Sequence, residues 1–235
     1  MKVSIILPTY NEKNNILNLI ESIFSNLAQI NVEKEIIIVD DNSPDQTGKT
    51  VQKNYQDNKN VMLLIRLNER GLASAIRFGI EKSSGDVIIV MDTDFNHNPA
   101  MIPQMIDFLK YYDCIIGSRF SRDGGMKDLS RYLGSYIFNL FVRIVLRTQI
   151  QDNTSGFFSI RREKLYEVNF DNIFYGYGDY YFRFLFFARK QRLTLLEVPV
   201  FYELRKFGES KSNLFKLLFK YSYEILKLKV CCQHV

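Results

Sequence analysis

Two carboxylates, Asp92 and Asp94, stand two residues apart directly after the apolar run 87–91. If that run is a buried strand, side-chain alternation places both on one side, with Thr93 pointing elsewhere. Carboxylates held so close repel each other unless a cation lies between them, and their hard oxygens suit Mg²⁺ or Mn²⁺. Asn96 repeats the two-residue step and offers a neutral oxygen. The pattern therefore predicts a divalent-metal site, and His97 is either a further ligand or an ordinary loop histidine.

Polar clusters also follow two other apolar runs. Residues 8–12 (PTYNE) come after the run 3–7, and residues 40–45 (DDNSPD) come after the run 35–39. In a parallel sheet, ligands bind outside the carboxyl ends of the strands, so all three clusters are expected at one edge. Asp45 has an alternative role, because it could cap the helix that begins near Thr47.

Short apolar runs alternate with helical patterns through the first half of the chain. We expect strands at 3–7, 35–39, 61–65, 87–91 and 114–117, with helices at 16–27 and 72–80 between them. Further strands are expected at 155–160 and 193–198, with a helix at 179–190. This order predicts an α/β fold with a doubly wound, mostly parallel sheet. A helix at 131–147 is apolar nearly all round, so it must pack on another segment or lie on a membrane.

Composition is that of a compact globular protein. Of the 235 residues, 46% are hydrophobic and 24% are charged, which fits one large domain with an appendage. No apolar run is long enough to span a bilayer, and we expect neither secretion nor an integral membrane protein. Cys114, Cys231 and Cys232 lack metal-ligand spacing, which fits a reducing cytosol.

Positive charge gathers in the last part of the chain. The net charge is +5, and residues 183–235 contain eleven Lys or Arg against four Glu. From residue 212 the sequence predicts an amphipathic helix, with Leu214, Leu218, Tyr221, Ile225 and Leu228 on one face and lysines on the other. Such a helix either docks on the core or lies in a membrane interface. Nucleic acid is disfavoured, because the aromatic residues are not interleaved with the cations.

Taken together, the motifs resemble those of family 2 glycosyltransferases with a GT-A, Rossmann-like fold, and among these the dolichyl- and polyprenyl-phosphate mannose synthase group. The matching segments are PTYNE, VDDNSPDQTG, RGLASAIRFGI, GDVIIVMDTDFNHNP, IIGSRF, DNTSGFF and EVPVFYELRKFGESK, in that order. The chain departs from the group at Asn96, where Gln is more frequent. It also departs at residues 176–186, where GYGDYYFRFLF replaces a helix with Gln and Glu.

The resemblance implies a role for each matching position. Nucleotide-sugar binding is assigned to Pro8, Tyr10, Glu12, Asp40, Asp41 and Asp92. The metal, Mn²⁺ or Mg²⁺, is assigned to Asp92, Asp94 and Asn96. Phosphate and acceptor binding is assigned to Arg119, Arg131, Ser135, Arg205, Ser210 and Lys211. The groups expected to act in catalysis are Asp92, Asp94, Arg119, Arg205 and Lys211.

The implied activity is inverting transfer of a hexose, with mannose from GDP-mannose favoured, to a polyprenyl or dolichyl phosphate. The alternative is transfer to a hydroxyl acceptor in surface polysaccharide synthesis, with Asp179 as base. A third possibility is a silent nucleotide-sugar-binding or membrane-tethering module, but the intact Asp-x-Asp disfavours it. We expect residues 1–211 to form the catalytic domain, with a nucleotide-sugar half (1–120) and an acceptor half (121–211). Residues 212–235 form a basic tail. The partners would be the nucleotide-sugar, the lipid phosphate and the cytosolic face of a membrane.

Overall fold

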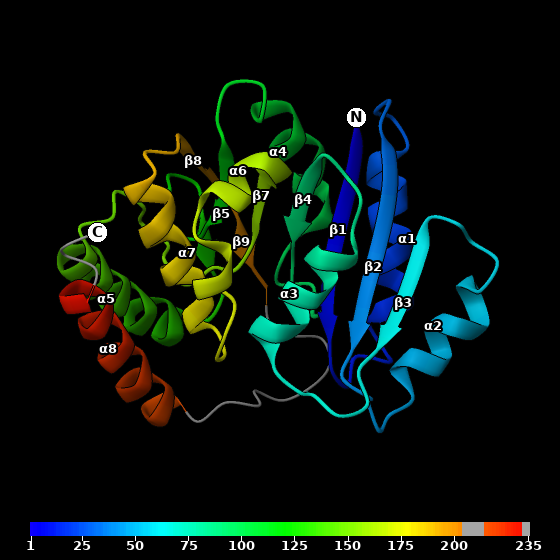
Figure 1. Cartoon of the computed structure of the whole chain (residues 1–235), viewed down its shortest axis with the longest axis horizontal. Helices are drawn as coiled ribbons and strands as arrows, with labels where there is room; N and C mark the ends of the chain where they lie inside the picture. Colours follow the sequence, from blue (N-terminus) through cyan, green and yellow to red (C-terminus); the bar gives the residue numbers. More distant parts are fainter. Residues whose placement is uncertain (204–213, 232–235) are drawn as a thin grey trace.

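The computed structural model describes residues 1–203 and 214–231, which form a central sheet with helices on both faces (Figure 1). The large sheet contains β1 (Lys2–Thr9), β2 (Glu33–Asp40), β3 (Val61–Ile65), β4 (Val87–Val90), β5 (Cys114–Ser118), β7 (Phe158–Arg161) and β8 (Leu195–Pro199). Its strand order is β3-β2-β1-β4-β7-β5-β8, and only β7 runs antiparallel to its neighbours. The short strands β6 (Gly125–Met126) and β9 (Phe201–Tyr202) pair separately.

The helices cover the sheet in two layers, with a third group at one end. They are α1 (Ile16–Leu27), α2 (Thr47–Tyr55), α3 (Leu72–Lys82), α4 (Ile102–Phe108), α5 (Leu129–Leu146), α6 (Arg162–Glu167), α7 (Asp179–Lys190) and α8 (Leu214–Cys231), with 3-10 turns η1 (Pro99–Met101) and η2 (Phe170–Asn172). One core cluster joins α3, α6 and α7 to one face of the sheet, and another joins α1, α2 and α4 to the opposite face. The inner strands β1, β2, β4 and β5 are buried on both sides along most of their length, which explains their continuous Ile and Val content.

The sequence predicted most of this arrangement. The doubly wound, mostly parallel sheet is confirmed, and the helices at 16–27 and 179–190 have the expected bounds. Several strand ends differ by one to three residues: β4 ends at Val90, before the expected 91, β7 begins at Phe158, three residues later than expected, and β8 begins at Leu195, two residues later. The short strands β6 and β9 were missed, because two-residue strands have no periodicity to detect.

The last described element, α8, is a docked helix. The inner face of α8 packs against α5 and α7 in a cluster that includes Val142, Phe182, Phe186, Ile225 and Leu228. Ile225 is fully buried and Leu228 is 7% exposed, so the apolar face predicted for the tail contacts the core. The two helices α5 and α8 lie side by side at the left of Figure 1.

We predict that Gly79→Ala destabilises the fold by about 1–3 kcal/mol, because helix α3 approaches the sheet closely at this residue. A Cβ there would lie 2.6 Å from Ile6 Cγ2 and 3.0 Å from Val39 Cγ2, both on β-branched side chains. Urea unfolding followed by circular dichroism measures the change.

The matched control is Gly134→Ala on α5, where nothing lies within 4 Å of the new Cβ. That substitution should stabilise the protein by about 0.5–1 kcal/mol, since Ala costs less backbone entropy than Gly in a helix. Equal effects of the two substitutions would contradict the close packing of α3.

Candidate active site

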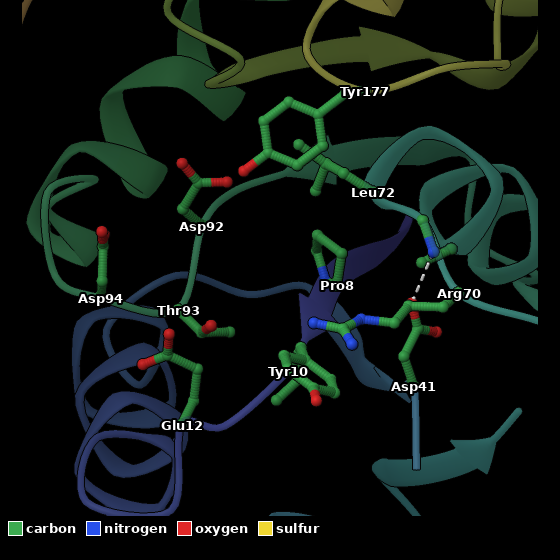
Figure 2. A pocket seen from close by; sticks show the side chains of 13 residues that line it. Pro8, Tyr10, Glu12, Asp41, Arg70, Leu72, Asp92, Thr93, Asp94 and Tyr177 are labelled. Carbon is green, nitrogen blue, oxygen red and sulfur yellow. Dashed lines mark hydrogen bonds between the residues drawn. The ribbon is translucent and has the colours of Figure 1, made fainter. Parts of the chain in front are cut away.

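A cavity of about 480 Å³ opens where β1 and β4 lie side by side. The chain leaves β1 for β2 on one side and reaches β4 on the other, so this is the switch point of the sheet, the usual place for a ligand in such folds. The cavity is lined by Pro8, Thr9, Tyr10, Glu12, Asp41, Arg70, Gly71, Leu72, Ala75, Asp92, Thr93, Asp94 and Tyr177 (Figure 2). The clusters after β1, β2 and β4 do meet at one edge, as expected.

The loop after β4 is held by a buried histidine. The backbone N–H of Asp92 donates to Nδ1 of His97 at 2.8 Å, so the ring proton is on Nε2. Nε2 lies 2.7 Å from the Tyr202 hydroxyl and 3.1 Å from the carbonyl oxygen of Ser155. The ring stacks on Phe157, with centroids 4.9 Å apart. His97 therefore holds the loop after β4 in place. Because both of its ring nitrogens are engaged in these contacts, His97 is not placed as a metal ligand.

Asp92 and Asp94 both line the cavity, but not by strand alternation. They lie beyond the end of β4, and Thr93 between them lines the cavity as well. Asn96 donates to Asp94 twice, from its backbone N–H at 3.1 Å and from its side-chain amide at 2.8 Å. Asn96 thus orients the Asp94 carboxylate. The sequence had suggested another role for Asn96, that of supplying a third oxygen ligand to the metal.

The carboxylates suit a hard divalent cation. The Asp92 side chain is 46% exposed and, with Asp94, faces the cavity. Within residues 1–203 and 214–231, no three side chains of His, Cys, Asp and Glu gather into a metal-binding group. Mg²⁺ is commonly held by one or two carboxylates together with substrate phosphates, so two carboxylates beside an open cavity fit a metal that arrives with its nucleotide.

Tyr10 and Arg70 form the opposite wall. The Arg70 guanidinium carbon lies 3.6 Å from the centroid of the Tyr10 ring, a stacked cation–π contact. Figure 2 shows the Arg70 side chain reaching over Tyr10, and Glu12 on the other side of Tyr10, next to Thr93. Glu12 accepts a bond from Asn15 at 2.8 Å, which orients its carboxylate. An aromatic face, a cation and a carboxylate together can contact the base, phosphates and ribose of a nucleotide.

The two acids at the carboxyl end of β2, Asp40 and Asp41, make contacts that the sequence did not predict. Asp40 is 2% exposed, does not line the cavity, and accepts bonds from the backbone and hydroxyl of Ser43. Burial raises the pKa of Asp40 above its usual range, and this effect outweighs the hydrogen bonds from Ser43, which lower the pKa. The predicted contact of Asp40 with base or ribose is therefore not supported by the geometry. Asp41 reaches the cavity, where it pairs with Arg66 at 2.6 Å and accepts from the Gly71 backbone at 2.8 Å.

Asp45 has the structural role at the start of α2 that the sequence analysis gave as its alternative. Its carboxylate accepts from the backbone N–H of Thr47 at 2.9 Å and from that of Lys13 at 3.0 Å. It thus caps the start of α2 and ties it to the loop after β1.

Arg119, predicted to bind phosphate, forms a buried ion pair in this structure. It is 5% exposed and lies outside the cavity lining. Its Nε donates to Asp152 Oδ2 at 2.8 Å, and its Nη2 donates to Asp152 Oδ1 at 2.7 Å. Burial by itself lowers the pKa of Arg119, but the adjacent Asp152 carboxylate outweighs it and holds the pKa above its usual value. The sequence could not distinguish a buried ion pair from a phosphate site, because both use arginine.

The other predicted phosphate residues lie away from the cavity or outside the described chain. Arg131 is exposed and Ser135 is half-buried, both on α5, and neither lines the cavity. Arg205, Ser210 and Lys211 lie outside the described residues, so their predicted roles remain predictions.

Asp179 begins α7 and is 1% exposed. It accepts from the backbone N–H of Tyr177 at 2.6 Å and from Arg183 at 2.7 Å. Arg183, itself fully buried, also donates to the carbonyl oxygens of Ile173 and Tyr175. Asp179 therefore shapes the loop that carries Tyr177, and it does not line the cavity.

Arg70 and Tyr177 are among the cavity residues to which the sequence analysis gave no role. Arg70 stands in the motif RGLASAIRFGI, which was quoted without a role for its first residue. Tyr177 stands between two glycines, and Figure 2 shows its hydroxyl pointing toward Asp92. The glycines flanking Tyr177 are the signal that could have identified a loop residue placed against a ligand.

We predict that Arg119→Met destabilises the protein by about 3–5 kcal/mol, because it leaves Asp152 buried and without its counter-ion. Urea unfolding measures the loss. Arg131→Met, on the exposed surface of α5, is the control and should change stability little. A stable Arg119→Met variant with reduced turnover would instead restore the phosphate-binding role.

Known proteins resemble this chain over most of its length. Residues 4–168 match the family described as Glycosyl transferase family 2. A dolichol-phosphate mannosyltransferase of Pyrococcus furiosus is 36% identical over 97% of the chain, which spans 64% of that relative. An undecaprenyl-phosphate mannosyltransferase of Micrococcus luteus is 33% identical over 91% of the chain and 88% of its own length. A dolichol-phosphate mannosyltransferase of Saccharomyces cerevisiae is 30% identical over 98% of the chain and 88% of its own length.

Solved structures share the fold. Glucosyl-3-phosphoglycerate synthase from Mycobacterium tuberculosis in complex with UDP superposes with a TM-score of 0.71 at 18% identity, covering 97% of this chain and 80% of that one. The same enzyme with Mn²⁺, UDP-glucose and phosphoglyceric acid gives 0.70 at 19% identity, covering 97% and 79%. The expected GT-A fold is thereby confirmed.

Proposed function

The chain belongs to glycosyl transferase family 2, and from this premise we propose that it moves mannose from GDP-mannose to a polyprenyl phosphate, with inversion at the anomeric carbon. The observation that carries the proposal is the likeness to three mannosyltransferases, each named for a dolichol or undecaprenyl phosphate, over more than nine-tenths of the chain. Because the chain spans less than two thirds of the archaeal relative, donor and acceptor are proposals for this chain.

The side chains that line the cavity could contact the base, the ribose and the diphosphate of a nucleotide-sugar. Tyr10 offers an aromatic ring to the base, and Glu12 offers a carboxylate to the base or ribose. Arg70 is an exposed guanidinium whose fork suits diphosphate oxygens. Asp92 and Asp94 would hold Mn²⁺ or Mg²⁺ against the diphosphate. A bound metal ion would offset the negative charge that develops on the departing nucleoside diphosphate.

The buried position of Asp179 favours a phosphate acceptor over a hydroxyl. A sugar hydroxyl is a poor nucleophile and needs a base, but the carboxylate proposed for that task is 1% exposed and bonded to Arg183. A lipid phosphate has a second pKa of about 6, so it is already an anion at neutral pH and needs positioning more than deprotonation. The hydroxyl-acceptor alternative therefore loses its candidate base.

A polyprenyl acceptor implies work at a membrane surface. No helix among residues 1–203 and 214–231 is long and apolar enough to cross a bilayer. We propose a peripheral protein on the cytosolic face, with residues 1–211 as the catalytic domain and the basic tail as part of the attachment.

Asp92→Asn and Asp94→Asn should each weaken Mn²⁺-dependent binding of GDP-mannose at least tenfold and abolish most transfer, because each removes a charged ligand oxygen. The fold should remain stable, since neutralising one of two neighbouring carboxylates relieves repulsion. Isothermal titration with and without Mn²⁺ measures donor affinity.

The matched control is Asp107→Asn, an exposed carboxylate on α4 that pairs with Lys110. It should leave donor binding unchanged. Wild-type affinity of Asp92→Asn and Asp94→Asn for GDP-mannose with Mn²⁺ would contradict the metal assignment.

Donor choice can be measured directly by thermal shift. GDP-mannose with Mn²⁺ should raise the melting temperature more than UDP-glucose with Mn²⁺ at the same concentration, since the ligand that binds the folded state more tightly stabilises it more. A larger shift with UDP-glucose would replace the proposed donor while leaving the transferase assignment in place.

A further inference from the structure

Arg183, on α7, is the largest of the fully buried side chains among the residues that the structure describes. A buried guanidinium has lost its hydration, so it is stable only where hydrogen bonds and opposite charges replace the water. Its Nη1 pairs with Asp179 Oδ2 at 2.7 Å, and a second carboxylate, that of Glu224 on α8, lies 3.6 Å from the same nitrogen. The Arg183 charge therefore lies between carboxylates from two helices.

The other donors of Arg183 hold the chain just before Tyr177. Its Nε donates to the carbonyl oxygen of Ile173 at 3.0 Å, and its Nη2 donates to that of Tyr175. The guanidinium carbon also lies 3.5 Å from the centroid of the Tyr175 ring. A planar group with five N–H donors can make all of these contacts at once, whereas the compact ammonium of a lysine cannot.

The Asp179 carboxylate holds the backbone of Tyr177 itself. Its Oδ1 accepts from the Tyr177 N–H at 2.6 Å, while its Oδ2 accepts from Arg183. Gly176, which precedes Tyr177, has a φ of +79°, and a Cβ at this residue would collide with the Asp179 carboxylate. Glycine adopts this backbone conformation without a steric cost and leaves room for the carboxylate. The Asp179–Arg183 pair therefore sets the course of the loop around Tyr177.

Helix α8 supports this loop from the outside. The Tyr175 hydroxyl donates to Glu224 at 3.4 Å, and Glu224 is only 13% exposed. On the other side of Tyr177, a Cβ at Gly178 would lie 2.5 Å from the Tyr221 hydroxyl oxygen. The α8 side chains thus lie against the loop both before and after Tyr177.

Tyr177 lines the cavity at the end away from Tyr10. Figure 2 shows the two rings on opposite sides of Pro8, with the Tyr177 hydroxyl pointing toward Asp92. A nucleotide-sugar that has its base at Tyr10 and its diphosphate at Asp92 and Asp94 would have its sugar next to Tyr177. A phenol hydroxyl can both donate to and accept from a sugar hydroxyl, so its position matters for recognition of the sugar.

We propose that Arg183 is a positioning residue for sugar recognition, which holds Tyr177 against the transferred sugar through Asp179 and with support from Glu224. The proposal rests on the proposed function, since the sugar of the donor is what Tyr177 would contact. Arg183 does not line the cavity, so its effect on the donor passes through Tyr177. A role in stability alone would lower the melting temperature and leave the recognition of the sugar unchanged.

The contribution of the sugar to donor affinity measures this role. It is the Kd of GDP divided by the Kd of GDP-mannose, both determined with Mn²⁺ by isothermal titration. Tyr177→Ala should lower this ratio about tenfold and Arg183→Lys about fivefold, which is the range of one lost hydrogen bond, with the affinity for GDP itself unchanged. The matched control is Arg77→Lys on α3, which changes an arginine paired with Asp171 and should leave the ratio unchanged.

A double variant separates positioning from an independent effect. Arg183→Lys/Tyr177→Ala should have the same ratio as Tyr177→Ala alone, because Arg183 acts through Tyr177. Glu224→Gln retains the shape of the side chain and should lower the ratio about twofold, an effect that should also vanish when Tyr177 is Ala. This milder variant keeps the test in force if Arg183→Lys does not fold. Its control is Glu167→Gln on the exposed surface of α6.

Three results would overturn the inference. The first is a wild-type ratio in Tyr177→Ala, and the second is a wild-type ratio in Arg183→Lys or, where that variant does not fold, in Glu224→Gln. The third is a reduction in Arg183→Lys/Tyr177→Ala that equals the product of the two single reductions, because Arg183 would then act independently of Tyr177.

Failure of the proposed function gives different results. If the wild type binds UDP-glucose and not GDP-mannose, the proposed donor is wrong, and the ratio for UDP and UDP-glucose tests Arg183 with the same expectations. If the ratios change as described but the wild type transfers nothing to any isoprenyl phosphate, the proposed acceptor is wrong and the positioning role of Arg183 stands.

Discussion

The hydrogen bond from the Asp92 backbone to the buried ring of His97 is the contact on which the site depends. It folds the loop after β4 back on itself, so that Asp92 and Asp94 face the cavity. The imidazole is in turn anchored by Ser155 and Tyr202, residues that precede β7 and end β9. The two carboxylates are therefore held in place by elements from the far end of the chain.

Acidic and basic side chains lie in different parts of this molecule. Carboxylates gather at the cavity, where a cation and a diphosphate would balance them. The buried arginines Arg119 and Arg183 are committed to Asp152 and Asp179. Other cations lie on the outer surface of α5 and α8. The acidic side chains at the cavity and the cations on the outer surface of α5 and α8 therefore lie apart within one domain.

The sequence predicted the sheet, most helices and the meeting of three polar clusters, because strand-end chemistry and apolar periodicity are local properties. It could not predict which acid at each strand end faces the cavity. Asp40 and Asp41 are neighbours of the same type, and only the packing against α2 and Arg66 separates their roles. The ion pair of Arg119 could not be predicted for the same reason, since its partner Asp152 lies thirty-three residues away in sequence and is adjacent only in the fold.

The most direct test of the account is the lipid product itself. Purified full-length chain would be incubated with GDP-mannose, Mn²⁺ and anionic vesicles containing either a polyprenyl phosphate or the corresponding polyprenol, and the lipids examined by mass spectrometry. The account predicts a mannosyl phosphate lipid from the phosphate, with no product from the alcohol. A mannosylated alcohol with none of the phosphate product would contradict it.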